Sequence, residues 1–194
     1  QHAVDSGMKI TTVLHCTNDR RQPFRAKHAA YYALALAGRR GSSMSKRVDV
    51  TTLLPNDVRI IRFESEWEGA WQRIPDHVAD QLADVDVVVK FGMGLLRDPE
   101  SIPSTYGVLS YHHGDPETPR GRPAGFYELG EGSPVMGIIV QQLTNTLDAS
   151  LILAKAYSRV DPTSYKATFN NAATIGTPLL AQALETLRCS DARE

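Results

Sequence analysis

The sequence predicts a single α/β domain in which helices form layers on both sides of a largely parallel sheet. Short apolar segments rich in β-branched residues alternate with segments of helical character, which is typical of repeated strand–helix units. The 194 residues, 42% of them hydrophobic, are enough to bury one core of ordinary size. Neither an internal repeat nor a low-complexity tract divides the chain. Residues 1–194 are therefore expected to form one domain.

Four segments define the first half of the expected fold. Residues 8–16 (MKITTVLHC) are apolar and β-rich and precede a polar loop, as expected of a buried strand. Residues 26–37 are rich in alanine and predict a helix, which a glycine and a basic pair follow. Residues 59–64 (RIIRFE) predict a short strand, and residues 67–85 predict a helix that starts or breaks near Pro75.

The second half contains the most regular strand patterns. Three segments rich in valine, leucine and isoleucine predict buried strands: residues 85–89, 107–113 and 135–143. A short helix is expected at residues 125–132, and residues 150–160 fit either a strand or a short helix. The chain then predicts a helix over residues 164–187 that Pro178 breaks.

Composition points to a small-molecule partner. The chain has 21 Lys and Arg against 22 Asp and Glu, so no global field favours nucleic acid or an anionic membrane. No apolar stretch approaches the roughly 18 residues of a membrane span, and no secretory signal pattern is present. Cys16 and Cys189 form neither a disulfide framework nor a metal-ligand spacing. We expect a cytoplasmic protein without a metal.

Polar residues gather where two of the expected central strands end. Residues 91–96 follow one strand, and residues 110–120 include two histidines, an aspartate and an arginine at the end of the next. In open α/β sheets, ligands bind outside the carboxyl ends of the strands. His112 and His113 are adjacent in a strand, so their side chains should point to opposite faces and only one should enter a given pocket.

Three motifs in order resemble the folate-dependent formyltransferase family, which includes methionyl-tRNA formyltransferase and sugar N-formyltransferases. They are VVVKFGMGLL at residues 87–96, GVLSYHHGDPETPRGRPAG at residues 107–125 and MGIIVQQLTNTLDAS at residues 136–150. Each alone is a weak signal, but their order and separation match the family over residues 85–156. The resemblance implies a three-layer, Rossmann-like formyltransferase fold. It also implies that QHAVDSG is the tail of a first helix, so that the first strand is missing from this chain.

The resemblance also implies a reaction and its residues. In the family, an amine attacks the formyl carbon of formyltetrahydrofolate, and a histidine, an aspartate and an asparagine assist. The histidine falls on His112 and the aspartate on Asp148, which suit proton transfer and oxyanion stabilisation. The asparagine falls on Ser110, whose hydroxyl is a shorter donor. The family's folate-facing loop falls on Phe91, Gly92, Met93, Gly94, Leu95 and Leu96.

This chain departs from the classical family motif around the predicted site. GDPET replaces the family's SLLP, and Ala149 and Ser150 follow the aspartate where the family has a glycine. These features resemble a divergent branch of the family, in which His113, Asp115 and Glu128 belong to the pocket. The substrate-binding group is predicted to contain His113, Asp115, Arg120 and Gly121.

Three functions remain open at this stage. The leading prediction is a formyltransferase that uses formyltetrahydrofolate and a small-molecule amine. A formyltetrahydrofolate hydrolase, with water as the acceptor, would need the same acid and base. A non-catalytic binding or regulatory domain on the same fold is the third, and Ser110 and the missing first strand favour it. The sequence leaves open whether the protein forms a homo-oligomer.

Overall fold

The computed structural model describes residues 7–18, 29, 32–33, 49–115, 124–146 and 149–191. Most of the helix expected at residues 26–37 therefore lies outside the described residues. Three predicted site residues also lie outside them: Arg120, Gly121 and Asp148.

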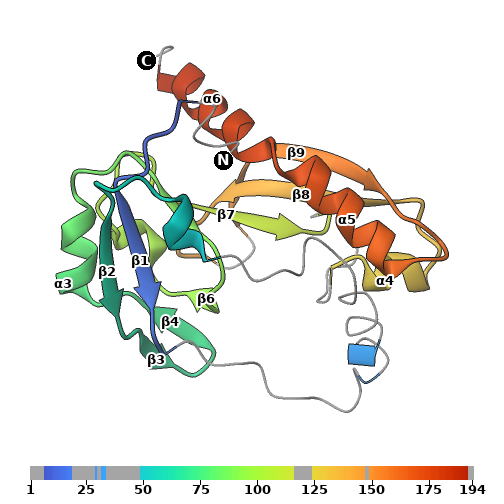
Figure 1. Cartoon of the computed structure of the whole chain (residues 1–194), viewed down its shortest axis with the longest axis horizontal. Coiled ribbons are helices and arrows are strands. Elements are labelled where there is room, and N and C mark those ends of the chain that lie inside the picture. The colour runs from blue at the N-terminus through green and yellow to red at the C-terminus, as the bar shows by residue number, and fades with distance from the viewer. Residues whose placement is uncertain are drawn as a thin grey trace.

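The amino-terminal part is built on a parallel strand pair. Strand β1 (Thr12–Cys16) pairs with β2 (Arg59–Phe63) along its whole length, from Thr12 opposite Arg59 to Cys16 opposite Phe63. A short 3-10 turn, η3 (Val50–Leu53), precedes β2. Both strands were expected from the sequence, and Figure 1 shows them side by side.

A hairpin lies where the sequence predicted only a helix. Strands β3 (Glu66–Glu68) and β4 (Trp71–Arg73) pair antiparallel around Gly69, which has a positive φ of 62°. The helix begins only after Pro75, as α3 (Asp76–Ala79), and continues as the 3-10 helix η4 (Asp80–Leu82). The prediction of a helix start near Pro75 is confirmed, and the hairpin before it was missed.

The carboxyl-terminal part contains a four-stranded sheet. Its strand order is β5 (Val88–Lys90), β7 (Val108–His113), β8 (Val135–Gln142) and β9 (Leu151–Arg159). Strands β5 and β7 are parallel, whereas β8 runs antiparallel to both β7 and β9. Residues 150–160 thus form a strand rather than a helix. Antiparallel neighbours such as these need no crossover helix between them.

Short elements connect these strands. Strand β6 (Leu95–Leu96) follows β5 and pairs parallel with β4, and the 3-10 turn η5 (Pro99–Ser101) follows it. Helix α4 (Phe126–Gly130) lies between β7 and β8. This helix confirms the one expected at residues 125–132.

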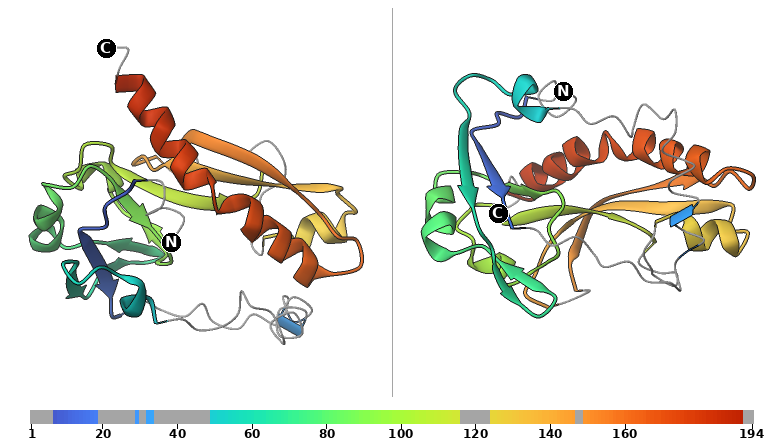
Figure 2. Two further views of the ribbon diagram at one scale, coloured as in Figure 1. Left: turned by 45° about the horizontal axis from the view of Figure 1, so that its top comes forward. Right: turned by 60° about the horizontal axis from the view of Figure 1, so that its bottom comes forward.

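Two helices cover one face of the four-stranded sheet, as both views in Figure 2 show. They are α5 (Tyr165–Gly176) and α6 (Leu179–Asp191), and the break near Pro178 is confirmed. Ser164 caps α5 by accepting a hydrogen bond from the Ala167 N–H at 3.1 Å. None of the helices in the described ranges is long and apolar enough to cross a membrane.

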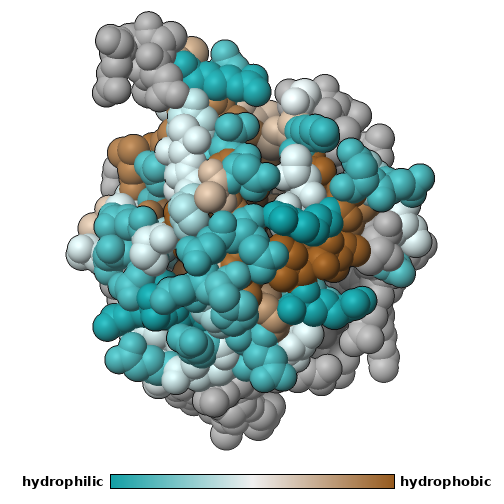
Figure 3. Space-filling model, turned by 90° about the vertical axis from the view of Figure 1, so that its left-hand side faces the viewer, coloured by the Kyte–Doolittle hydropathy of each residue, from teal (hydrophilic) through white to brown (hydrophobic). Residues whose placement is uncertain are grey.

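Strand β7 begins between two hydrophobic cores. Leu109 is fully buried with Ile138, Ala172 and other side chains under α5 and α6. Val108, its neighbour, belongs to a second core on the other side with Phe63, Ile74 and Leu96. The outer face of this second side is mainly hydrophilic, with hydrophobic groups showing between the polar side chains (Figure 3). The two cores and the sheet between them make a three-layer α/β fold.

Candidate functional site

The end of β7 presents its side chains alternately to the two faces of the sheet. Leu109 and Tyr111 pack with the core under the helices, and the His113 ring stacks on Phe169 of α5 with centroids 6.5 Å apart. Strand alternation therefore places Ser110 and His112 on the face opposite the helices. The two adjacent histidines lie on opposite faces, as the sequence predicted.

His113 lies in an apolar environment. Burial lowers the pKa of His113 below 6.5, and the neighbouring His112 lowers it further. The ring packs against Phe169 on the helix-covered face. The structure thus places His113 on the other face from His112 and Ser110, as expected if only one of the two histidines enters a given pocket.

The strand register assembles polar side chains around Ser110. Ser110 lies opposite Gln141 on β8 and beside Lys90 on β5. Paired residues project to the same face of a sheet, so Lys90 and Gln141 flank the position of the family's asparagine. Ser110 is 9% exposed, and its hydroxyl donates a long hydrogen bond of 3.4 Å to the Tyr111 carbonyl. Sequence reasoning missed Lys90 and Gln141 because their position depends on the register.

The same register places a lysine on the His112 face. His112 lies opposite Ile139, and Ile139 lies opposite Lys155 on β9. Adjacent strands are about 4.8 Å apart, so Lys155 is two strands from His112 on the same face. Its Nζ lies 3.1 Å from Oδ1 of Asp115, and their side chains are only 24% and 13% exposed.

The chain that leaves β7 folds back across β8. The Gly114 N–H donates to the Gly137 carbonyl at 2.8 Å. A Cβ on Gly137 would lie 2.9 Å from the backbone N and Cα of Asp115, and one on Gly114 would lie 3.3 Å from Nε2 of His112. This close approach places the Asp115 backbone against Gly137, on the strand that pairs with the end of β7. Lys155, the partner of Asp115, was missed, because one lysine in an edge strand gives no local signal.

The loop of residues 91–96 exposes some of its side chains and buries others. Phe91 is 70% exposed, and its ring stacks on Tyr111 of β7 with centroids 5.8 Å apart. Leu95 is 40% exposed. Met93 and Leu96 instead pack with the second core. Their side chains therefore anchor the loop to the protein interior and are not exposed to solvent as Phe91 is. Gly92 and Met93 have positive φ angles of 69° and 56°.

Tyr111, under the exposed ring of Phe91, is itself anchored. Burial raises the pKa of Tyr111, and a hydrogen bond with the Leu180 backbone opposes the increase. The phenol therefore stays protonated and connects β7 with the start of α6. Among the residues that the structure describes, no three His, Cys, Asp or Glu side chains form a group able to hold a metal ion.

The described strands define an α/β protein with parallel strand pairs and with loops at their carboxyl ends. No protein-family model matches the chain, and no curated protein matches it either. Solved structures do: glycinamide ribonucleotide transformylase 1 from Geobacillus kaustophilus aligns with a TM-score of 0.58 and 15% identity, covering 93% of this chain and 98% of that one. The chain therefore has the formyltransferase fold.

Two further solved structures extend this likeness. A formyltetrahydrofolate deformylase from Pseudomonas putida aligns with a TM-score of 0.51 and 15% identity, over 91% of this chain and 64% of that one. HypX from Aquifex aeolicus aligns with a TM-score of 0.51 and 17% identity. The alignment covers 95% of this chain but only 28% of the HypX chain. At these identities, the likeness establishes the fold.

We predict that Gly137→Ala destabilises the protein by about 1–3 kcal/mol, because the added methyl overlaps the Asp115 backbone and the chain must shift. Urea unfolding monitored by circular dichroism measures this change. Gly130→Ala in α4 is the matched control, because its Cβ would meet no atom within 4 Å. Equal stability of the two variants would contradict the close approach.

We predict that His113 makes the protein less stable as the pH falls below about 6.5. The folded state lowers the pKa of His113, so the unfolded chain binds the proton first and protonation favours unfolding. His113→Phe should flatten the fall in unfolding free energy between pH 7.5 and 5, measured by urea titration at each pH. His77→Gln, at an exposed position on α3, is the control and should keep the wild-type profile. Identical slopes for His113→Phe and wild type would rule this out.

Proposed function

We propose that this protein transfers a formyl group from formyltetrahydrofolate to a small-molecule amine. The observation that carries the proposal is the stack of Phe91 on Tyr111. This contact joins the exposed loop after β5 to Tyr111 of β7, the residue that directly precedes His112. The stack lies on the helix-covered face and His112 points to the other face, so the contact fixes the loop against β7 at the residue next to the histidine that the motif assigns to catalysis.

The fold neighbours support formyl chemistry at the level of class. Their names describe a transformylase that acts on glycinamide ribonucleotide and a deformylase that acts on formyltetrahydrofolate. The carboxyl-end loops of the sheet are where such a fold binds ligands. The residues around the loop fit a folate, because Phe91 and Leu95 expose apolar surface for a planar ring.

His112 is the proposed group that moves the proton or donates to the developing oxyanion. An imidazole side chain can serve either task. Asp148, carried over from the resemblance, would orient the ring or accept the proton of the attacking amine. Ser110 is the proposed second donor, with its hydroxyl on the same face as His112.

The Asp115–Lys155 pair is the proposed boundary of the acceptor side. It lies across β8 from His112 and is largely removed from solvent. A partly buried charge pair strengthens local electrostatic interactions because water screens it less than it screens surface charges. A polar acceptor would meet a fixed ammonium and carboxylate there, with Arg120 and Gly121 proposed nearby from the motif.

Hydrolysis of formyltetrahydrofolate is the second candidate. The deformylases among the fold neighbours favour it, and water can replace the amine without any change in the acid and base. The two activities differ in their products: a formylated amine from one, and free formate from the other.

We predict that His112→Ala lowers turnover by at least about a hundredfold, because the variant loses the proposed acid–base or oxyanion group. Product formation from formyltetrahydrofolate with a panel of small amines, followed by mass spectrometry for formylated amine and free formate, measures the loss. Calorimetry with 5-formyltetrahydrofolate should show that donor binding survives. His77→Ala, at an exposed position on α3, is the control. Unchanged turnover in His112→Ala would remove the catalytic assignment and favour a binding domain.

We predict that Ser110→Asn raises turnover by about tenfold or more, since it restores an amide donor at the position flanked by Lys90 and Gln141. Steady-state kinetics on the same substrates measure the change, and Ser110→Ala should move turnover in the opposite direction. If both variants match wild type, a different group stabilises the oxyanion.

A further inference from the structure

A buried glutamine lies directly behind the loop of residues 91–96. The side chain of Gln72, on β4, is fully buried. Its Oε1 accepts a hydrogen bond from the Gly94 N–H, and its own backbone carbonyl accepts one from the Arg97 N–H at 2.8 Å. One residue of the hairpin therefore fixes the loop at Gly94 and also fixes Arg97, the residue directly after the loop.

The hydrogen bonds continue from Gln72 to the end of β1. Nε2 of Gln72 donates to Oγ of Ser65 at 3.0 Å, and that hydroxyl donates to Oδ1 of Asn18 at 2.9 Å. Asn18 and Ser65 are joined twice more, through the Ser65 N–H and the Ser65 carbonyl, both at 2.9 Å. The amide of Gln72 thus has partners at both ends, as a buried polar group requires.

The loop needs such support because of its backbone conformation. Met93 has a positive φ of 56°, which side-chain-bearing residues adopt only when their surroundings impose it. A Cβ on Gly94 would lie 3.0 Å from Oε1 of Gln72, so glycine is what permits the close hydrogen bond. The glycine at position 94 is therefore explained by its contact with Gln72.

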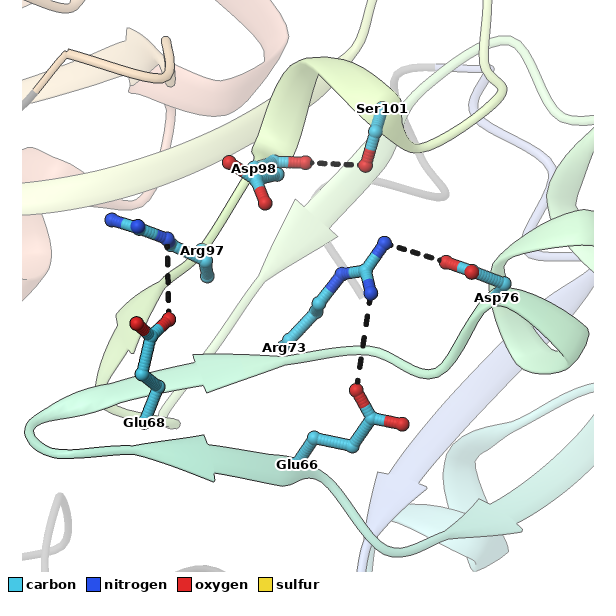
Figure 4. Close-up of polar contacts among 7 residues, drawn as sticks. All are labelled: Glu66, Glu68, Arg73, Asp76, Arg97, Asp98 and Ser101. Carbon is cyan, nitrogen blue, oxygen red and sulfur yellow. Dashed lines mark hydrogen bonds and ion pairs between the residues drawn. The ribbon is translucent and has the colours of Figure 1, made fainter.

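The solvent side of the hairpin adds weaker contacts, shown in Figure 4. Arg97 approaches Glu68 at 3.5 Å and lies 5.4 Å above the Trp71 ring. Arg73 pairs with Asp76 at 2.8 Å. These side chains are largely exposed, and exposed ion pairs contribute little. Gln72 is therefore the principal support.

We propose that Gln72 is a positioning residue that holds the 91–96 loop in its ligand-binding conformation, and that Ser65 and Asn18 tie this loop to the end of β1. A preformed loop lowers the entropic cost of binding. The identity of the ligand, a folate, rests on the function proposed above. The geometric role of Gln72 does not.

The first test uses Gln72→Met, which keeps the approximate side-chain volume and removes both hydrogen bonds. We expect the Gly94 amide to exchange with solvent about tenfold faster or more, measured by NMR on the ligand-free protein. We also expect the Kd for 5-formyltetrahydrofolate to rise about tenfold in calorimetry, with kcat nearly unchanged and the donor KM raised. A change in kcat alone, without a change in donor KM, would contradict a positioning role.

The matched control is Ile74→Val, which shortens a buried side chain in the same core. It should lower the unfolding midpoint while leaving Gly94 exchange and donor binding at wild-type values. Equal effects of Ile74→Val and Gln72→Met on exchange and binding would reduce Gln72 to a general stabilising residue and overturn the proposal.

Ser65→Ala provides the second variant, and it carries the test if Gln72→Met does not fold. It removes the link to Asn18 and leaves the Gln72–Gly94 bond available, so we expect a smaller, same-direction change in Gly94 exchange and donor Kd. Wild-type values in this variant would refute the connection to β1. If the wild-type protein itself fails to bind the folate, the proposed function is wrong, and the exchange data alone decide the role of Gln72.

Discussion

The two-sided burial of β7 is the constraint on which the candidate site depends. Val108 is packed into one core and Leu109 into the other, and both are almost fully buried. A shift of one residue in the pairing of β7 would exchange the two faces of the strand. That shift would place Leu109 toward the wrong core and would also exchange His112 with His113. Packing at the start of the strand therefore decides which histidine lies on the face opposite the helices.

The antiparallel strands β8 and β9 continue the face of the sheet on which His112 lies. Paired residues project to the same face of a sheet. The register of β7, β8 and β9 therefore aligns side chains of the three strands in rows across that face. Gly137 lets the chain after β7 cross one of these strands at backbone contact distance. The crossing brings Asp115 to Lys155. Withdrawing such a pair from water costs free energy, so its contribution lies more in fixing one arrangement than in stabilising the fold.

The loop of residues 91–96 depends on a different part of the molecule. Phe91 and Leu95 are exposed to solvent, whereas Met93 and Leu96 pack with the second core. The backbone of Met93 has a positive φ angle. The hairpin behind the loop supplies the buried side chain of Gln72, which accepts a hydrogen bond from the Gly94 N–H and donates one to Ser65. The orientation of His112 thus depends on the packing of β7, and the loop depends on the β3–β4 hairpin. The loop and β7 are in contact where Phe91 stacks on Tyr111.

The sequence alone determined the elements with strong local patterns. The valine-rich strands, the helix break at Pro178 and the opposite orientation of His112 and His113 follow from periodicity and from proline geometry. The three motifs together gave the formyltransferase fold. The β3–β4 hairpin was missed because strands of three residues are too short to show a period, and the surrounding residues fit a helix.

Only the tertiary structure revealed the partners across the sheet. The Asp115–Lys155 contact joins residues 40 positions apart, and the Asn18–Ser65 contact joins residues 47 apart. The residues next to Gln72 in the sequence give no indication that its side chain is buried. These pairings depend on strand register and on the close approach of two backbones. Both are set by packing of the whole domain, so no local stretch of sequence contains them.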